Sequence, residues 1–194
     1  MKTANTRWHD GAVTPADRVA ALGFKGATIW FTGLPASGKS TLAVEVEALL
    51  IGAGRPALRL DGDNLRHGLN GDLGFSAEDR AENVRRTAHA AALLAEAGVV
   101  ALVALVSPYA SDRATARAIH EAAGVPFREI WVSTGLAECE RRDPKGLYAR
   151  ARAGELPGLT GVGDMYEVPE APELEIGGAE PIPAAAARVL AALA

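Results

Sequence analysis

The stretch "FTGLPASGKS" (residues 31–40) separates an apolar run, "ATIWF" (27–31), from a run with helical spacing, "STLAVEVEALL" (40–50). Its last eight residues match the pattern G-x-x-x-x-G-K-S/T. Glycines let several backbone N–H groups converge on one anion, and the N-terminus of the following helix adds partial positive charge. A turn that only reverses the chain needs the glycines but not Lys39 or Ser40. The stretch therefore predicts a nucleotide phosphate site, in which the lysine reaches the phosphates and the hydroxyl binds Mg²⁺.

Strand and helix patterns alternate along the rest of the chain. Short apolar runs predict strands at 27–32, 56–60, 99–106, 127–134 and 173–176. Apolar spacing and capping residues predict helices at 15–22, 39–51, 77–96, 111–123, 136–142 and 183–194. The run 99–106 is apolar at every position, which is typical of a parallel strand covered on both faces. We therefore expect an α/β fold of the phosphate-loop kinase type, with a parallel five-stranded sheet flanked by helices.

Three of these helices have a predicted N-terminal cap. Thr14 precedes an N1 proline and is followed by Asp17. Ser76 is followed by Asp79, which resembles a capping box, and Ser111 opens the helix that ends near residue 123.

The pattern fails between residues 144 and 172, where glycine and proline are frequent. A stretch of this length without regular structure is usually functional or disordered, and we interpret it as a mobile lid. Five cations lie in or next to it: Arg141, Arg142, Lys145, Arg150 and Arg152. Such a cluster suits closure over a polyphosphate, although for the last two a solvent-exposed position is the better interpretation.

Length and composition limit the class of protein. The 194 residues suit one domain, 1–194, with an N-terminal segment over 1–24. A net charge of −4 argues against a general nucleic-acid-binding protein. The N-terminus lacks the apolar stretch of a signal peptide, and the longest apolar run, 97–106, is far shorter than the roughly 20 residues of a membrane span. The single cysteine, Cys139, fits a reducing compartment, so we expect a cytoplasmic protein that contacts no membrane.

Two acids follow the predicted strand 56–60. Asp61 or Asp63 can hold Mg²⁺ or accept a proton from an acceptor hydroxyl, because the carboxyl ends of parallel strands face the ligand crevice. The alternative is a turn motif, which Asp, Gly and Asn all favour. The strand 99–106 ends in Ser107 and a proline, without the aspartate that many ATPases have there.

Three polar residues share one face of the predicted helix 77–96. Arg80, Asn83 and Thr87 are spaced three and four apart. An arginine near a helix N-terminus favours an anionic ligand, and the alternative is a solvated face.

Together these pieces resemble adenylylsulfate kinase, which phosphorylates the 3′-hydroxyl of adenosine 5′-phosphosulfate (APS) with ATP. The resemblance covers nearly the whole chain. The matching stretches are "WHDGAVT" (8–14), "GATIWFTGLPASGKSTLA" (26–43), "LDGDNLRHGLNGDLGFSAEDRAENVRR" (60–86), "VSPYASDR" (106–113), "CERRDPKGLYARARAGELPGLTG" (139–161) and "YEVPEAPEL" (166–174).

The resemblance implies a role for each matching residue. The ATP loop would be Gly33, Leu34, Pro35, Ala36, Ser37, Gly38, Lys39, Ser40 and Thr41, with Arg142 near the donor nucleotide. Asp61 and Asp63 would serve magnesium and the acceptor hydroxyl. APS would contact Arg66, Phe75, Arg80, Asn83, Lys145 and Leu147. Ser107 would be a catalytic and substrate-binding residue and matches a serine described in the family as a phosphoserine. In-line transfer between two bound substrates nevertheless needs positioning and charge neutralisation, not a covalent relay.

The chain departs from the family pattern in the lid. Leu159 stands where a phenylalanine commonly helps to sandwich the adenine of APS, and "VGDMYE" (162–167) also differs. Loss of one stacking ring predicts weaker APS binding rather than loss of chemistry. The resemblance further implies that the protein forms a homodimer and is functionally coupled to an ATP sulfurylase. Another small-molecule phosphate-loop kinase, or a regulatory nucleotide switch, is the alternative function.

Overall fold

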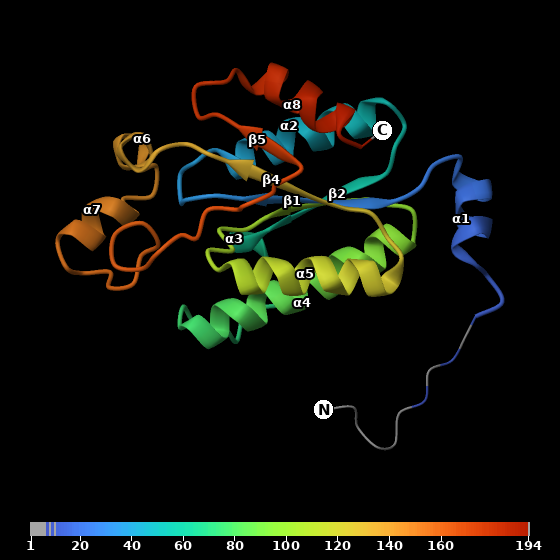
Figure 1. The fold of residues 1–194 in the computed structure, drawn as a ribbon, viewed down its shortest axis with the longest axis horizontal. Helices are drawn as coiled ribbons and strands as arrows, with labels where there is room; N and C mark the ends of the chain where they lie inside the picture. Colours follow the sequence, from blue (N-terminus) through green and yellow to red (C-terminus); the bar gives the residue numbers. More distant parts are fainter. Residues whose placement is uncertain (1–6, 8, 10, 194) are drawn as a thin grey trace.

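The protein, seen here in a computed structural model, is built on a parallel sheet between two layers of helices (Figure 1). Its strands are β1 (Ala27–Thr32), β2 (Ala57–Asp61), β3 (Val100–Ala104), β4 (Phe127–Val132) and β5 (Leu174–Ile176). They lie in the order β2-β3-β1-β4-β5, and every neighbouring pair is parallel. The predicted five-stranded parallel sheet is confirmed. The structure describes residues 7, 9 and 11–193, so parts of the predicted N-terminal segment 1–24 and of "WHDGAVT", and the last residue of the tail, lie outside the described residues.

The helices divide between the two faces and the two ends of the sheet (Figure 1). The covering helices are α2 (Lys39–Gly52) and α8 (Ile182–Ala191) on one face, and α4 (Ala77–Glu96) and α5 (Ala110–Ala123) on the other. At the carboxyl ends of the strands lie α3 (Gly62–Leu65), α6 (Leu136–Arg142) and α7 (Leu147–Arg152), whereas α1 (Pro15–Leu22) lies at the opposite end.

The core consists of two apolar layers, one on each face of the sheet. Successive residues of β1 point to opposite faces. Ile29 and Phe31 therefore pack beneath α2 and α8, whereas Trp30 packs beneath α4 and α5. Every residue of β1 and β3 is buried, as expected for central strands of a sheet covered on both sides.

The helix caps follow the predictions in two of three cases. Thr14 and Asp17 form a full capping box at α1. The Ser76 hydroxyl accepts from the Asp79 backbone N–H, but the Asp79 carboxylate accepts from the Gly74 N–H at 3.0 Å, so only half of the expected box exists.

The prediction of Ser111 as a cap is wrong. Helix α5 begins one residue earlier, at Ala110, so that Ser111 lies inside its first turn. The Glu167 carboxylate accepts from the Ala110 N–H at 2.6 Å. A carboxylate from a distant part of the chain thus supplies the anion at this helix terminus, which no local pattern reveals.

Three strands are shorter than predicted, and the lid is more regular. β3 ends at Ala104, and residues 105–107 leave the sheet to line the site. β4 ends at Val132, and β5 begins at Leu174. The expectation that residues 144–172 lack regular structure is wrong over α7. Beneath the lid, Cys139, Tyr148 and Leu159 form a small apolar cluster separate from the sheet core.

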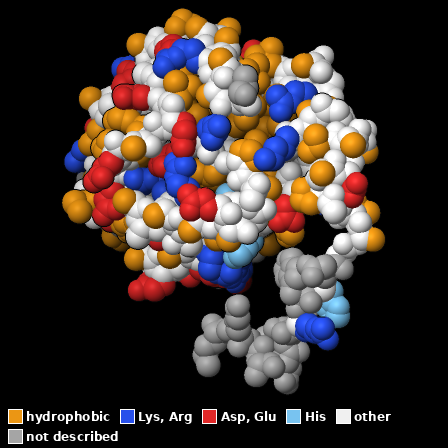
Figure 2. All heavy atoms as spheres, turned by 45° about the vertical axis from the view of Figure 1, so that its right-hand side comes forward, with side chains coloured by type: hydrophobic (Ala, Val, Ile, Leu, Met, Phe, Trp, Pro, Cys, Tyr) orange, Lys and Arg blue, Asp and Glu red, His pale blue; other side chains and the backbone are white. Residues whose placement is uncertain are grey.

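Charges of both signs are interspersed over the face of the molecule that Figure 2 presents. Among the described residues, no helix combines the length and apolar character that crossing a membrane requires.

Candidate active site

The phosphate loop joins the end of β1 to the start of α2. Gly33 has φ 149° and Gly38 has φ 109°, values that side chains disfavour. A Cβ atom at Gly33 would also lie 2.6 Å from the Val132 carbonyl oxygen. These two glycines let the loop curl over the N-terminus of α2, so that its backbone N–H groups can converge on an anion.

Lys39 is buried within this loop. Its Nζ atom donates to the carbonyl oxygens of Gly33 at 2.9 Å and Leu34 at 2.7 Å, and to the Ser37 hydroxyl at 3.3 Å. Burial disfavours the ammonium form and lowers the pKa of Lys39 to about 8. A nearby triphosphate would restore the preference for the charged form, so anion binding and protonation at Lys39 are coupled.

Ser40 and Asp61 form a pair of oxygen donors beside the loop. The Ser40 hydroxyl donates to Asp61 Oδ2 at 2.6 Å, and Asp61 is 6% exposed. Hydroxyl and carboxylate oxygens suit Mg²⁺, which keeps several waters and phosphate oxygens in its shell. In the described part of the chain no three His, Cys, Asp or Glu side chains cluster. Ser40 and Asp61 are the residues that could hold a magnesium ion bound to a nucleotide.

Asp63 lies two residues further and pairs with the lid. Its carboxylate accepts a hydrogen bond from Lys145 Nζ. Both side chains remain more than half exposed, so the ion pair is accessible to a ligand and weak in stability terms. The structure thus brings together the predicted acid and the predicted lid cation.

Arg66 and Phe75 form a second, basic and aromatic wall. The Arg66 guanidinium lies 4.1 Å from the centre of the Phe75 ring, and its Nη1 donates to the Leu73 and Gly74 carbonyl oxygens. Burial, and then the charge of Arg80, lower the pKa of Arg66. Phe75 is 69% exposed, so ring surface remains available for stacking.

Arg80 joins helix α4 to the lid. Its Nη1 donates to the Thr160 hydroxyl and its Nη2 to the Gly158 carbonyl oxygen, both at 2.8 Å. Its Nε donates to the Phe75 carbonyl oxygen at 3.0 Å. An anionic ligand would compete with these neutral acceptors for the same N–H groups.

Ser107 is buried just beyond the end of β3, and its hydroxyl both accepts and donates a hydrogen bond. Its hydroxyl accepts from Trp30 Nε1 at 3.1 Å and donates to the Thr32 hydroxyl at 3.0 Å. Ser107 has φ 39°, a strained value for a residue with a side chain. Arg113 donates to its carbonyl oxygen at 2.8 Å and so stabilises this conformation.

One cavity of about 480 Å³ gathers most of these residues. Its lining includes the following predicted residues: Pro35, Ala36, Gly38, Lys39, Ser40, Thr41, Asp61, Asp63, Arg66, Phe75, Arg80, Asn83, Ser107, Arg142, Lys145 and Leu147. Gly33, Leu34 and Ser37 are not part of this lining. The cavity therefore combines the phosphate loop with the basic and aromatic wall.

Arg142 lies where the phosphate loop meets the β5–α8 connection. Its Nη1 donates to the Ser37 carbonyl oxygen at 3.3 Å and its Nη2 to the Gly178 carbonyl oxygen at 2.7 Å. This place suits the predicted contact with the donor nucleotide. Arg150 and Arg152 instead pair with surface glutamates, as expected for solvated side chains.

The sequence prediction missed two lid residues that line the cavity. Tyr148 is 2% exposed and donates to the Pro35 carbonyl oxygen at 2.9 Å. Thr160 is 1% exposed and accepts from Arg80. Both are uncharged, and both lie within the matching stretch 139–161, so membership in that stretch was the available signal.

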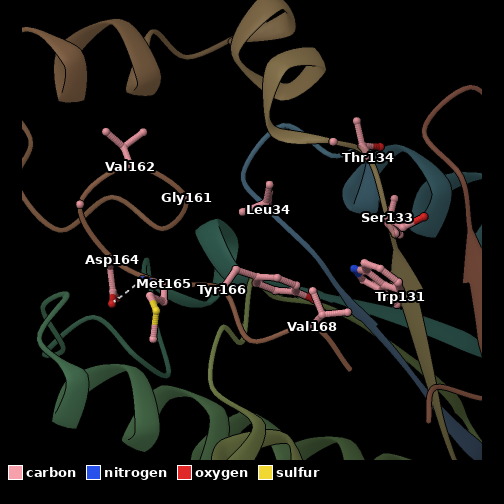
Figure 3. A pocket seen from close by; sticks show the side chains of 13 residues that line it. Leu34, Trp131, Ser133, Thr134, Gly161, Val162, Asp164, Met165, Tyr166 and Val168 are labelled. Carbon is pink, nitrogen blue, oxygen red and sulfur yellow. Dashed lines mark hydrogen bonds between the residues drawn. The ribbon is translucent and has the colours of Figure 1, made fainter. Parts of the chain in front are cut away.

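A second, more open cavity of about 650 Å³ lies between the end of β4 and residues 161–168 (Figure 3). Trp131, Tyr166 and Val168 form its apolar side (Figure 3). Among the described residues that line it, Asp164 is the only one with a charged side chain, and it already accepts from the Tyr109 hydroxyl at 2.7 Å. A lining without lysine or arginine is poorly suited to a phosphate.

Known proteins resemble this chain over most of its length. Residues 25–177 match the family model described as adenylylsulphate kinase. The adenylyl-sulfate kinase of Staphylococcus epidermidis is 50% identical over 169 residues, which cover 87% of this chain and 84% of that protein. The bifunctional enzyme CysN/CysC of Mycobacterium tuberculosis is 53% identical over 172 residues, covering 89% of this chain. This chain spans only 27% of that longer relative.

Solved structures give the same result. The M. tuberculosis APS kinase CysC in complex with AMPPNP and APS has a TM-score of 0.86 and 52% identity, covering 88% of this chain and 98% of that one. A gluconokinase from Sinorhizobium meliloti, with a TM-score of 0.53 and 18% identity, shares the fold alone. The family match over most of the chain and the identity to a relative of similar length agree, and this chain belongs to the adenylylsulphate kinase family.

Proposed function

We propose that this protein transfers the γ-phosphoryl group of ATP to the 3′-hydroxyl of APS, giving ADP and 3′-phosphoadenosine 5′-phosphosulfate (PAPS). The observation that carries the proposal is one cavity lined by two separate anion-binding groups, Lys39 with its loop and the pair Arg66 and Arg80. A single nucleotide triphosphate needs only the first group. A relative 52% identical to this chain was solved with an ATP analogue and APS bound together.

ATP would occupy the phosphate loop. Lys39 exchanges its carbonyl acceptors for phosphate oxygens, and Arg142 lies beside the same loop. Ser40 and Asp61 would hold Mg²⁺, which neutralises charge on the triphosphate.

APS would occupy the opposite wall, with its phosphosulfate near Arg66 and Arg80, its base against Phe75, and Leu147 beside it. Its 3′-oxygen forms the new bond to the γ-phosphorus, and the bond from that phosphorus to the ADP oxygen breaks. The hydroxyl proton passes to the Asp63 carboxylate, while Lys145 stays close to the developing charge. Positioning and charge neutralisation carry this reaction.

In this mechanism Ser107 would help to position the groups of the site and would not form a covalent intermediate. Ser107 is 3% exposed, and its hydroxyl hydrogen is donated to Thr32, a neutral hydroxyl that is not a general base able to activate it for attack on a phosphorus atom. The phosphoserine expected from the resemblance would require this buried network to open.

The lid would open for substrates to enter. In the structure the lid is held through Arg80 and Asp63, two side chains assigned to APS binding and catalysis. Substrate binding would replace these contacts, so lid closure and recognition of APS use the same groups.

We further propose that the protein works together with a sulfurylase, forms a dimer and is located in the cytoplasm. A bifunctional CysN/CysC relative supports the coupling. A relative from Thiobacillus denitrificans, 33% identical with a TM-score of 0.66, is a hexamer, so light scattering of the purified protein distinguishes a dimer from a larger assembly.

An ADP-release assay tests the proposed reaction. ATP and Mg²⁺ are supplied with APS and, in parallel, with gluconate, shikimate or nucleoside monophosphates. We expect ADP release with APS alone, and PAPS as the product by chromatography. Turnover of another acceptor and none of APS would indicate a different small-molecule kinase, and no acceptor-dependent turnover would indicate a nucleotide switch.

A further inference from the structure

We propose that Asn70 is a positioning residue that holds the side-chain amide of Asn83 in one direction, so that Asn83 offers only N–H donors to the acceptor side of the cavity. The proposal rests on the proposed function, because it concerns how that cavity recognises APS. Asn70 lies in the loop between α3 and α4, and the resemblance assigned it no role.

Three polar side chains meet beneath the acceptor wall. Asn70 and Thr87 are fully buried, and Asn83 is 8% exposed and lines the cavity. Asn70 Nδ2 donates to Asn83 Oδ1 at 2.8 Å and to Thr87 Oγ1 at 3.3 Å. Thr87 Oγ1 donates to the Asn83 carbonyl oxygen at 2.7 Å.

The chemistry of Thr87 determines the direction of every bond in this group. A hydroxyl has one hydrogen, and that of Thr87 is used on a backbone carbonyl, which can only accept. Towards Asn70 the hydroxyl must therefore accept, so the facing atom of Asn70 is its nitrogen. The second hydrogen of that nitrogen reaches Asn83, whose facing atom is therefore its oxygen.

The remaining group of Asn83 is its own Nδ2. Within the described part of the chain this nitrogen donates to no protein group, and the residue lines the cavity. Oxygens of a phosphosulfate are acceptors only, so an N–H donor attracts them, whereas an amide turned by 180° would present lone pairs. The orientation of the Asn83 side-chain amide thus determines whether this residue attracts or repels the phosphosulfate.

Asn70 retains a feature that packing does not explain. Its Oδ1 atom is buried and has no hydrogen-bond partner among the described residues. A buried acceptor without a partner costs stability, and an apolar side chain of similar shape would avoid that cost. The amide nitrogen is therefore the group for which the side chain is needed.

The first test measures KM and kcat for Asn70→Leu. The loop retains its backbone bonds from Asn70 N–H to the Leu65 carbonyl and from Leu73 N–H to the Asn70 carbonyl. We expect KM for APS to rise about tenfold, with kcat and KM for ATP within about twofold of the unchanged protein. If kcat fell and KM for ATP rose by a factor similar to that for APS, Asn70 would have only a structural role and the proposal would be overturned.

A double-mutant cycle separates action through Asn83 from direct action. If Asn70 acts through Asn83, Asn70→Leu adds little to KM for APS in an Asn83→Ala background. If Asn70→Leu raised KM for APS by the same factor with and without Asn83→Ala, the proposal would be overturned. The unchanged protein, assayed with APS in the same experiment, reports on the proposed function separately.

Side-chain amide NMR of the unchanged protein tests the direction without any substitution. We expect the Asn70 NH₂ protons to exchange slowly with solvent and to be insensitive to APS. The Asn83 NH₂ protons should exchange rapidly and shift when APS is added. Protected Asn83 protons before APS addition, or APS-sensitive Asn70 protons, would contradict the inferred arrangement.

Discussion

The two sides of the cavity are constructed differently. On the donor side, one contiguous loop of residues 33–41 supplies backbone amides, and Lys39 bonds to carbonyls of that same loop. On the acceptor side, Arg66, Arg80 and Lys145 come from three segments. Arg80 and Lys145 are held by contacts between segments, and Arg66 by carbonyl oxygens of its own loop. The donor side is therefore local and pre-formed, whereas the acceptor side depends on how the lid closes.

Lys39→Ala should have the largest effect, because it removes the one buried cation of the donor side. We expect kcat/KM for the APS reaction to fall about 10³-fold. Initial-rate kinetics measure this, and the exposed Lys25→Ala serves as a control that keeps its activity. Residual activity within tenfold would mean that the loop amides suffice without Lys39.

Asp63→Asn tests the chemistry at the junction of the two sides. We expect kcat to fall about 10²-fold with both KM values nearly unchanged, because the carboxylate accepts the hydroxyl proton. Asp72→Asn is the matched control, since Asp72 is an exposed carboxylate paired with Arg86 outside the cavity lining. Equal losses in both variants would indicate a general electrostatic effect.

Arg80→Ala separates the acceptor side from the donor side. Loss of charge-assisted bonds to the phosphosulfate should raise KM for APS about 30-fold and leave KM for ATP unchanged. Because Arg80 also bonds to Gly158 and Thr160, limited proteolysis should cut the lid faster. Arg85→Ala, on the same helix and paired with Glu82, provides the control. A parallel rise in KM for ATP would show that the two sides are not independent.

The pH dependence of ATP binding tests the donor side alone. The pKa of Lys39 is lowered to about 8 in the free protein, and a bound triphosphate favours the charged form. Affinity should be constant below pH 8 and fall about tenfold per pH unit above it, until the pKa of the bound state is reached. Calorimetry in buffers of different ionisation enthalpy should show proton uptake near pH 8.5. Lys25→Met, which removes an exposed lysine outside the cavity lining, should retain this profile.

Leu159→Phe should have the smallest effect and the opposite sign. Leu159 lines the acceptor cavity and packs on Cys139 and Tyr148. An aromatic ring opposite Phe75 would add a stacking surface, so KM for APS should fall about fivefold. Met165→Phe adds a ring to the exposed lid tip as a control. An unchanged KM, with a lower unfolding temperature, would mean that the larger side chain only strains the cluster.

Most of the sheet could be predicted from the sequence, because β3 is apolar at every position, β1 is mostly apolar, and α2 follows a glycine loop. The errors lie where distant segments replace local signals. Ser111 does not cap α5 because Glu167 supplies the anion there. α7 forms within a glycine-rich segment because its Tyr148 packs against Cys139 and Leu159.

The sequence alone determined the donor side, because a phosphate loop is one contiguous stretch of chain. Its glycines allow the backbone conformations that the loop requires, whatever the rest of the fold does. Through resemblance it also predicted the acceptor residues, but not their arrangement. Only the tertiary structure decided which groups meet: Lys145 with Asp63, Arg80 with Gly158, and Asn70 with Asn83. Side-chain hydrogen bonds between distant segments depend on packing and on the number of donors and acceptors at each meeting point, and neither quantity is encoded in a local pattern.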